Sequence, residues 1–530
     1  SSGSTAPSIV SVLPASSVSL NDYLFFSSNN IIEGPTAGFQ VVSPCTGTAP
    51  NFTNTNPLIF GDTFTETSTS PIDPRACGPA AYSNVDPVPN GDVFFSATTY
   101  KGAFGSVNWL DGWSFFNLPN RPGFVSSTST CPSAADPGDS DDPVALCGTL
   151  SADRRLYRGA LYVLTCQTFV PSGITLAIQA GVTIYASPLA SDGGGAPALI
   201  IEKGGRILAL GTSISPITFT AFNPTVSSSS SVSTDSTSTD TVVETRGKWG
   251  GLILLGSAPT NVATTTAIEG ITAKTYGGTN PTDSSGSLQY VRVWHGGAVV
   301  GANNEINGIT FGGVGSGTVV DHCEVAFNLD DGFEFFGGTV NVKYLSALFM
   351  GDDGFDTDQG YIGKGQFLFV IEGLTGDHSM EIDSGVGTNQ DVAPRSHPAF
   401  YSFTLIGGGT GTGARTGELI HVNDGTGGKF GNGILAFPNG NGLLFEDCGS
   451  MEYTQTLPAA SVSISNPGYF YFSANNIIDT ATTASQFALH TGTTSACTPA
   501  DTWTAVSGAP GFIAVATTDL AEGSATFNPL

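Results

Sequence analysis

A 22-residue spacing between two similar acidic segments constrains the fold of this chain more than any other feature. Residues 329–334 read Leu-Asp-Asp-Gly-Phe-Glu, and residues 351–356 read Gly-Asp-Asp-Gly-Phe-Asp. About 22 residues suffice for one coil of a β-solenoid, whose successive coils hydrogen-bond in parallel about 4.8 Å apart. The spacing therefore predicts that Phe333 stacks on Phe355 inside a solenoid, while the acidic residues form columns along it.

Short apolar segments between glycines support this architecture from about residue 155 onward. The expected strands are Ile174–Ile178, Val182–Tyr185, Leu199–Glu202, Ile207–Leu210, Ile217–Thr220 and Leu252–Leu255. Few helix signals and no Asn-Gly hairpin turns interrupt residues 174–255, so the strands are expected to coil around one axis and pair in parallel. The predicted fold is all-β, a right-handed parallel β-helix.

Four segments are expected along the chain. They are residues 1–58, which duplicate the C-terminal segment; residues 59–154, an irregular Cys- and Pro-rich segment held by disulfides; residues 155–456, the β-helix, with a Ser/Thr-rich loop at 226–246; and residues 457–530, the C-terminal coils. The division follows changes in Pro, Cys and Ser/Thr content, because packed strands need apolar residues that the polar stretches lack.

The two ends of the chain share a repeated motif. Residues 13–15 and 457–459 both read Leu-Pro-Ala, and residues 23–33 closely match residues 469–479, including the run Asn-Asn-Ile-Ile. This duplication predicts a chain that joins head to tail with copies of itself in a filament or surface array. The alternative is a duplicated segment that covers both ends of one solenoid. The expected assembly residues are Leu13, Tyr23, Phe25, Ile31, Tyr469, Tyr471 and Ile477.

The charge and the cysteines restrict the partners and the compartment. Forty-four acidic residues against 17 basic ones give a net charge of −27, which excludes nucleic acids and anionic lipids as natural partners. Apolar runs stay below the roughly 18 residues that membrane insertion requires. The disulfide candidates, none in a Cys-x-x-Cys pair, are Cys45, Cys77, Cys131, Cys147, Cys166, Cys323, Cys448 and Cys497. We therefore expect a secreted, mature chain, with the sequon at Asn51 as its glycosylation site.

The acidic columns need a compensating interaction, because two carboxylates about 5 Å apart repel by roughly 3 kcal/mol at an effective dielectric constant of 20. Three kinds remain open: bound Ca²⁺, protonation of some carboxyls, and hydrogen bonds from backbone N–H groups. The candidate Ca²⁺ ligands are Asp330, Asp331, Glu334, Asp352, Asp353, Asp356 and Asp358, with Glu381 and Asp383 as an extension on the next coil. No cofactor other than Ca²⁺ is expected.

The same columns offer a catalytic alternative, because paired carboxylates cleave glycosidic bonds as general acid and base. The candidates for this chemistry are Asp330, Asp352 and Asp353. The local candidates for the base of a lyase are Lys343, Lys364 and Arg395. His322 and His378 are expected to be hydrogen-bonded coil residues rather than metal ligands.

Three longer motifs carry a resemblance to a known group of proteins. They are Gly-Lys-Trp-Gly-Gly-Leu-Ile-Leu-Leu-Gly at 247–256, Asn-Glu-Ile-Asn-Gly-Ile-Thr-Phe-Gly-Gly-Val-Gly-Ser-Gly-Thr at 304–318, and Asp-Asp-Gly-Phe-Glu-Phe-Phe-Gly-Gly-Thr-Val-Asn at 330–341. From about Tyr100 to about residue 480 the chain resembles secreted bacterial cell-surface proteins with a pectate-lyase-like β-helix. The resemblance implies the fold and a surface location, and the Gly-His-Gly motif of polygalacturonases is absent.

We therefore predict a secreted structural protein, head-to-tail subunit or repeat of an extracellular filament or surface array, rather than an enzyme. The alternative is a Ca²⁺-dependent β-helix protein that binds or cleaves polysaccharide with its Asp-rich face.

Overall fold

A computed structural model describes the greater part of the chain. The described residues are 73–76, 79–89, 92–115, 143–221 apart from 189 and 193, 246–298 apart from 272, 305–372, 376–385, 390–407, 417–436, 438, 440–455, 467–478, 487–489, 506–507 and 512–514. The expected residues Leu13, Tyr23, Phe25, Ile31 and Asn51 lie outside these ranges, as do Cys45, Cys77, Cys131 and Cys497. Within the described ranges, no helix is both long enough and apolar enough to cross a membrane.

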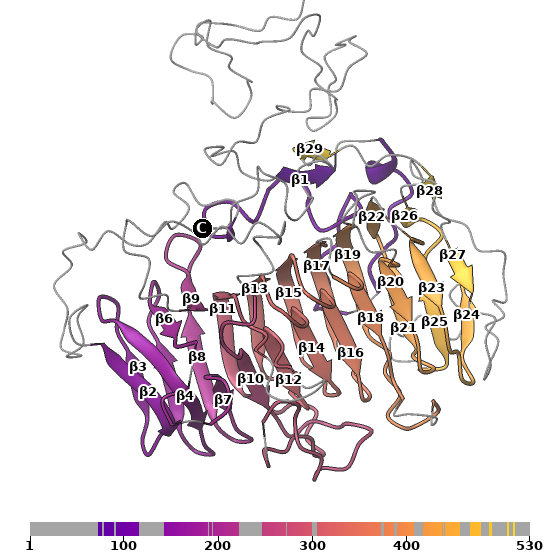
Figure 1. Ribbon diagram of the computed structural model, residues 1–530. Coiled ribbons are helices and arrows are strands. Elements are labelled where there is room, and N and C mark those ends of the chain that lie inside the picture. The colour runs from indigo at the N-terminus through magenta and orange to yellow at the C-terminus, as the bar shows by residue number, and fades with distance from the viewer. Residues whose placement is uncertain are drawn as a thin grey trace, which may run out of the picture. The chain divides into compact units, whose positions relative to one another are not determined.

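A parallel β-helix forms the main body, with 27 strands in one continuous sheet. Figure 1 shows the strands of successive coils side by side, from β2 at the magenta end to β27 at the yellow end. The six strands predicted from the sequence are β5 to β10, and each begins and ends within one residue of the expected limits. The right-handed parallel β-helix is therefore confirmed.

Each coil contributes to three faces of the solenoid, which the strand pairing defines. The first face contains β7 (Leu199–Ile201), β10 (Leu252–Leu255), β12 (Ile309–Gly312), β14 (Phe333–Phe336), β16 (Phe355–Asp358), β18 (Met380–Ile382), β20 (Ile420–Val422), β23 (Leu443–Phe445) and β27 (Phe487–Leu489). The second face contains β3 (Arg154–Leu156), β5 (Thr175–Ile178), β8 (Arg206–Leu210), β21 (Gly428–Gly431), β24 (Glu452–Thr454) and β25 (Tyr469–Phe472). The third face contains β2 (Val144–Thr149), β4 (Tyr162–Val170), β6 (Thr183–Ala186), β9 (Ile217–Ala221), β22 (Ile434–Ala436), β26 (Ile477–Ile478) and β28 (Val506–Ser507). The ends of β2 and β4 continue onto the first face, where β4 pairs with β7.

Five longer strands run from the second face into the third. They are β11 (Gly286–Trp294), β13 (Val319–Ala326), β15 (Asn341–Leu348), β17 (Lys364–Ile371) and β19 (Ala399–Ile406). Outside the solenoid, β1 (Asp73–Ala76) pairs antiparallel with β29 (Phe512–Ala514), and a 3₁₀ helix, η2, spans Pro79–Tyr82.

The bend within each long strand is made by a residue with positive φ that is not glycine. Tyr290, His322, Tyr344 and Phe367 have φ values of 48°, 52°, 56° and 63°. Their rings stack in order, with centroids 4.4, 4.3 and 4.6 Å apart. A left-handed conformation costs a residue with a side chain roughly 1–2 kcal/mol, and the stacked rings offset part of that cost. His322 is therefore a coil residue, as expected.

Apolar side chains from all three faces fill the interior. Phe333 and Phe355 are completely buried, and their rings stack with centroids 5.2 Å apart and an interplanar angle of 11°. Strands β5 and β6 alternate half-buried with buried residues, which is the pattern of a strand with one side toward the core. The predicted stack of Phe333 on Phe355 is confirmed.

Residues 92–115, which we call the N-terminal strap, lie against the outer side of the long strands. Gln366 in β17 accepts the Ser96 N–H at 2.8 Å and donates back to the Ser96 carbonyl at 2.7 Å. Further along, the Phe115 N–H donates to the buried Glu324 carboxylate at 2.9 Å. Trp113, Phe104 and other aromatic residues of the strap are buried, so this segment covers the coils.

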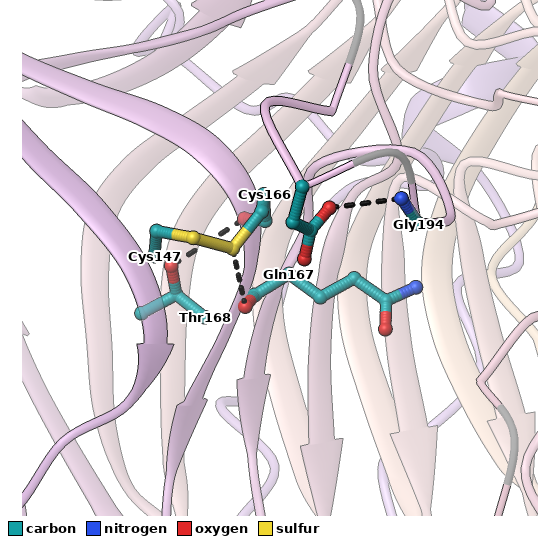
Figure 2. Close-up of a disulfide and its surroundings, with 6 residues drawn as sticks. Cys147, Cys166, Gln167, Thr168 and Gly194 are labelled. Atoms are coloured by element: carbon teal, nitrogen blue, oxygen red, sulfur yellow. Dashed lines mark hydrogen bonds between the residues drawn. A yellow bond between two sulfur atoms is a disulfide. The ribbon is translucent and has the colours of Figure 1, made fainter.

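A disulfide links Cys147 in β2 to Cys166 in β4, on neighbouring coils (Figure 2). Asp192 lies close to both sulfur atoms, but cysteines joined in a disulfide cannot supply thiolate metal ligands. Cys448 is also disulfide-bonded. The expectation for Cys323 is wrong: it is a buried free thiol inside the apolar core, where it packs as a small hydrophobic residue.

Candidate functional site

An outward column of polar residues crosses the first face of the solenoid. Because strand residues alternate between the two sides of a sheet, Glu334 and Asp356 point outward when Phe333 and Phe355 fill the core. The strand register continues this column onto the following coils. It reads Thr310, Glu334, Asp356, Glu381 and His421. The predicted stacking of Glu334 over Asp356 is confirmed.

A second acidic column lies in the turn that leads into these strands. The Asp353 N–H donates to Asp331 Oδ1 at 2.9 Å, and the His378 N–H donates to Asp353 Oδ1 at 2.6 Å. Each of these aspartates therefore accepts a backbone hydrogen bond from the following coil. Backbone N–H donors, one of the three compensations expected from the sequence, stabilise this column.

Glu334 and Asp356 have a different environment. Asn307 donates to Glu334, and Glu334 shares a hydrogen bond with Asp356, which requires a proton on one of the two carboxyls. Among the described residues, nothing donates to the buried Oδ1 atom of Asp356. Oxygens of Asp331, Glu334 and Asp356 lie within 4.8 Å of one another. A second group of three, Asp330, Asp331 and Asp352, is equally close.

Burial raises the pKa of nearly every carboxyl on this face, and repulsion from neighbouring carboxylates adds to the effect. The pKa of Asp330 rises to about 8, and that of Asp358 to about 7. Burial also raises the pKa of Asp331, Glu334, Asp353, Asp356 and Asp383. The ion pairs that Lys and Arg make within the described residues lie elsewhere, whereas the His378 ring lies 3.2 Å from Asp353 Oδ1. We call the set of outward acidic residues on β14, β16 and β18 and their leading turns the acidic face.

A loop covers the first face next to the acidic face. Ile268, Ile271 and Tyr276 of this loop pack with Ile253 and Phe336 of the sheet in a separate apolar cluster. The Tyr276 hydroxyl donates to the Gln359 side chain on the coil of β16. The loop places an apolar wall beside the carboxylates, which accounts for part of their desolvation.

Two histidines lie at the far end of the acidic face. The rings of His378, which precedes β18, and His421 in β20 have centroids 4.7 Å apart. His421 Nδ1 lies 2.9 Å from Glu381 Oε1, and its Nε2 lies 2.7 Å from Glu446 Oε2. His378 is hydrogen-bonded through its backbone, as expected from the sequence, and its ring also faces Asp353.

The three basic candidates for a lyase reaction make their contacts elsewhere. Lys343 Nζ donates to Ser96 Oγ of the strap at 3.1 Å, Lys364 pairs with Asp92 of the strap, and Arg395 pairs with Asp391. The acidic candidates Asp330, Asp352 and Asp353 are grouped on the acidic face. In the described structure the acidic candidates for catalysis therefore lie together, whereas the basic candidates for a lyase reaction lie away from them.

The C-terminal copy of the repeated motif forms a coil of the solenoid. Tyr471 in β25 pairs with Lys429 in β21, and Ile477 in β26 pairs with Ile434 in β22. Tyr469 begins β25. The counterpart residues near the N-terminus lie outside the described ranges.

His421 and Glu446 are members of the site that sequence reasoning missed. His421 follows Glu381 by 40 residues, whereas His378 follows Asp353 by 25 and Asp353 follows Asp331 by 22. The pairing of His421 with Glu381 cannot be recognised in the sequence, because sequence comparison detects only repeats of constant spacing and this coil is longer than the two before it. The one available signal was the alternation Ile420-His421-Val422, which places a polar residue between two apolar ones as Met380-Glu381-Ile382 does.

The fold and the site define a parallel β-helix protein with an acidic face. The chain belongs to the family with a pectate-lyase-like β-helix domain, whose family model matches residues 148–506. Such domains are typical of extracellular surface proteins and of proteins related to polysaccharides. No curated protein and no solved structure matches the chain.

Proposed function

We propose that the protein is a secreted surface β-helix whose acidic face binds Ca²⁺ and, through the ion, acidic polysaccharide. The buried oxygen of Asp356 that has no donor among the described residues carries this proposal. It belongs to a group of carboxylate oxygens within 4.8 Å of one another. Two oxygens on the same Ca²⁺ are separated by at most about 5 Å, because each Ca–O bond measures about 2.3–2.6 Å.

The donor set favours Ca²⁺ over softer metals, because the ligands of this group are carboxylate oxygens only. Asp331 belongs to both groups of three, so two adjacent ions can share it. Burial raises the pKa of Glu334 and Asp356 most, and repulsion from neighbouring carboxylates adds to it. A bound divalent cation offsets that repulsion.

A cation also explains how such a chain can bind an acidic glycan. The net charge of −27 repels polyanions, and Ca²⁺ reverses the local sign of the acidic face. Binding is favoured over cleavage because Lys343, Lys364 and Arg395 contact the strap or a surface turn and not the acidic face.

Titration calorimetry with Ca²⁺ tests the ion site. Asp356→Asn is expected to lower the Ca²⁺ affinity at least about tenfold, because it removes one of the three carboxylate ligands, the others being Asp331 and Glu334. Asp321→Asn, an acidic residue on the second face, is the matched control and should keep the wild-type affinity. Wild-type protein that binds no Ca²⁺ at millimolar concentration would contradict the proposal.

Glycan binding is tested separately, by co-sedimentation with insoluble polygalacturonate and with neutral dextran. Retention on polygalacturonate in Ca²⁺, and release by a chelator, is the expected result. Retention that persists in chelator, or that is equal on dextran, would exclude a Ca²⁺ bridge.

We also propose a second function, head-to-tail assembly, because a specific contact favours it. In the C-terminal copy, Asn476 Oδ1 accepts the Gly433 N–H at 2.7 Å and its Nδ2 donates to the Phe430 carbonyl at 3.1 Å. The motif Asn-Asn-Ile-Ile thus fixes a coil onto the preceding one. Since Asn476 already occupies these groups within each molecule, we infer that the same motif at residues 29–32 docks in a similar way on the open end of a second molecule's solenoid.

Light scattering and negative-stain imaging of the full chain test this assembly. Wild-type protein should form concentration-dependent chains, and Asn30→Ala should reduce them about tenfold or more, because it removes the amide that corresponds to Asn476, whose side chain makes two hydrogen bonds in the C-terminal copy. Ser28→Ala is the control. Monomers throughout the accessible concentration range would contradict head-to-tail assembly and leave the Ca²⁺ proposal untouched.

A further inference from the structure

Two buried histidines and a glutamate form a group distinct from the all-carboxylate groups of the acidic face. Glu381 in β18 pairs in register with His421 in β20, and His378 precedes β18 on the same coil as Glu381. Both histidines are only 8% exposed. Neighbouring coils therefore hold two imidazoles and a carboxylate against one another in a rigid part of the solenoid.

The donor atoms of this group are close enough for one small metal ion. One ring nitrogen from each histidine and one oxygen of Glu381 lie within 4.8 Å of one another, and His421 Nδ1 lies 2.9 Å from Glu381 Oε1. Ligands of a tetrahedral Zn²⁺ are about 3–3.5 Å apart, because the bonds measure about 2.0–2.1 Å. Side-chain movements of about 1 Å bring the three donors to that spacing.

One ring nitrogen of each histidine already lies beside a carboxylate of the kind that metal-bound histidines need. His421 Nε2 lies 2.7 Å from Glu446 Oε2, and His378 Nδ1 lies 3.2 Å from Asp353 Oδ1. A metal-bound imidazole usually donates its second N–H to a carboxylate, which fixes the tautomer and the ring orientation. On the opposite side, His378 Nε2 lies 3.4 Å from Asp377 and 3.9 Å from Glu418, either of which can be the fourth ligand.

The choice of metal follows from the imidazoles. Nitrogen ligands favour Zn²⁺ and related transition metals, whereas Ca²⁺ prefers oxygen ligands alone. We propose that His378, Glu381 and His421 bind one divalent ion of the zinc class. This site is separate from the proposed Ca²⁺ site, since its three ligands differ from Asp331, Glu334 and Asp356.

A protonated His421 held between Glu381 and Glu446 is the competing interpretation. Burial lowers the pKa of His421, but hydrogen bonds to these two glutamates outweigh burial and raise it. Such an imidazolium would stabilise the same residues without a metal. The two interpretations differ in whether stoichiometric Zn²⁺ binding occurs.

The test uses the full chain without a polyhistidine tag. Bound metal is first removed from the protein with a chelator, and Zn²⁺ is then titrated in the presence of a chromophoric indicator that competes for the ion. One equivalent should bind, and His378→Asn and His421→Asn should each weaken that affinity about 100-fold or more. Glu446→Gln should weaken it about tenfold, the usual effect of losing a partner of a metal-bound histidine. His322→Asn is the control, because Asn also tolerates the positive φ of 52° at this bend.

A second measurement does not depend on whether the variants fold. Co²⁺ added to wild-type protein should give the intense visible absorption of a four-coordinate ion with nitrogen ligands. Absence of this spectrum, absence of Zn²⁺ binding, or unchanged Zn²⁺ affinity in folded His421→Asn would each overturn the proposal. Ca²⁺ affinity should be unchanged in His421→Asn, so failure of the zinc site can be distinguished from failure of the Ca²⁺ proposal.

Discussion

His397 shows how a single partly buried residue makes the stability of this β-helix depend on pH. Its Nδ1 lies 2.8 Å from the Arg395 carbonyl. Burial lowers the pKa of His397 to about 4, and the charges of Lys429 and Arg395 add to this effect. The folded protein therefore holds this imidazole neutral, while the unfolded chain binds a proton near the ordinary pKa of about 6.5.

The consequence is a loss of stability in acid. Because the folded pKa lies below the unfolded one, the contribution of His397 is complete above about pH 6.5 and is lost as the pH falls toward 4. The difference corresponds to about 3 kcal/mol, as an order of magnitude. His397→Asn keeps an N–H donor but cannot titrate, so its melting temperature should fall less steeply between pH 6.5 and pH 4. Equal slopes for the two proteins would contradict this account, and equal melting temperatures at pH 7.5 are the control.

At the scale of the elements, stacking between aromatic rings offsets backbone strain at the bends of the long strands. Tyr344 has a φ of 56°, and its ring lies 4.3 Å from the His322 ring and 4.6 Å from the Phe367 ring. Removing the ring forfeits two stacking contacts of about 0.5–1.5 kcal/mol each. Ala retains the strain of the left-handed backbone, whereas Gly does not.

Tyr344→Ala should therefore lower the free energy of unfolding by about 2 kcal/mol, and Tyr344→Gly by roughly 1 kcal/mol less than that. Denaturant unfolding of both variants beside the wild type measures the order. A glycine variant less stable than the alanine variant would show that the bend is not strained.

The elements also show which features can be predicted from the sequence. A constant spacing of 22 residues gave the register of Phe333 on Phe355 and of Glu334 on Asp356 before any strand pairing was known. The coil that brings His421 beside Glu381 is 40 residues long, so no repeated spacing marks it. Cys323 was expected in a disulfide because an even number of cysteines favours pairing, yet its place in β13 points it into the core. Local patterns thus predict strands and constant registers, whereas contacts across coils of unequal length need the three-dimensional structure.

At the scale of the whole molecule, the N-terminal strap joins coils that are far apart in sequence. Glu324 in β13 accepts hydrogen bonds from Ser114, from the Phe115 N–H and from Trp294. Arg292 in β11 donates to the Trp113 carbonyl at 2.8 Å. These contacts link the strap to strands about 180 to 210 residues later in the chain. Glu324 accepts two of these hydrogen bonds from the end of the strap, and hydrogen bonds to a charged group contribute about 1.5–3 kcal/mol each.

Glu324→Ala should therefore release the end of the strap without unfolding the solenoid. A lost attachment of about 1.5 kcal/mol or more raises the population of the open strap about tenfold, and limited proteolysis within residues 92–115 should accelerate by the same factor. The parallel coils should stay resistant, since their apolar core does not include Glu324. Asp321→Asn, on the same strand, is the control and should be cleaved at the wild-type rate. Uniform acceleration of cleavage across the β-helix would instead mean that the strap and the coils unfold as one unit.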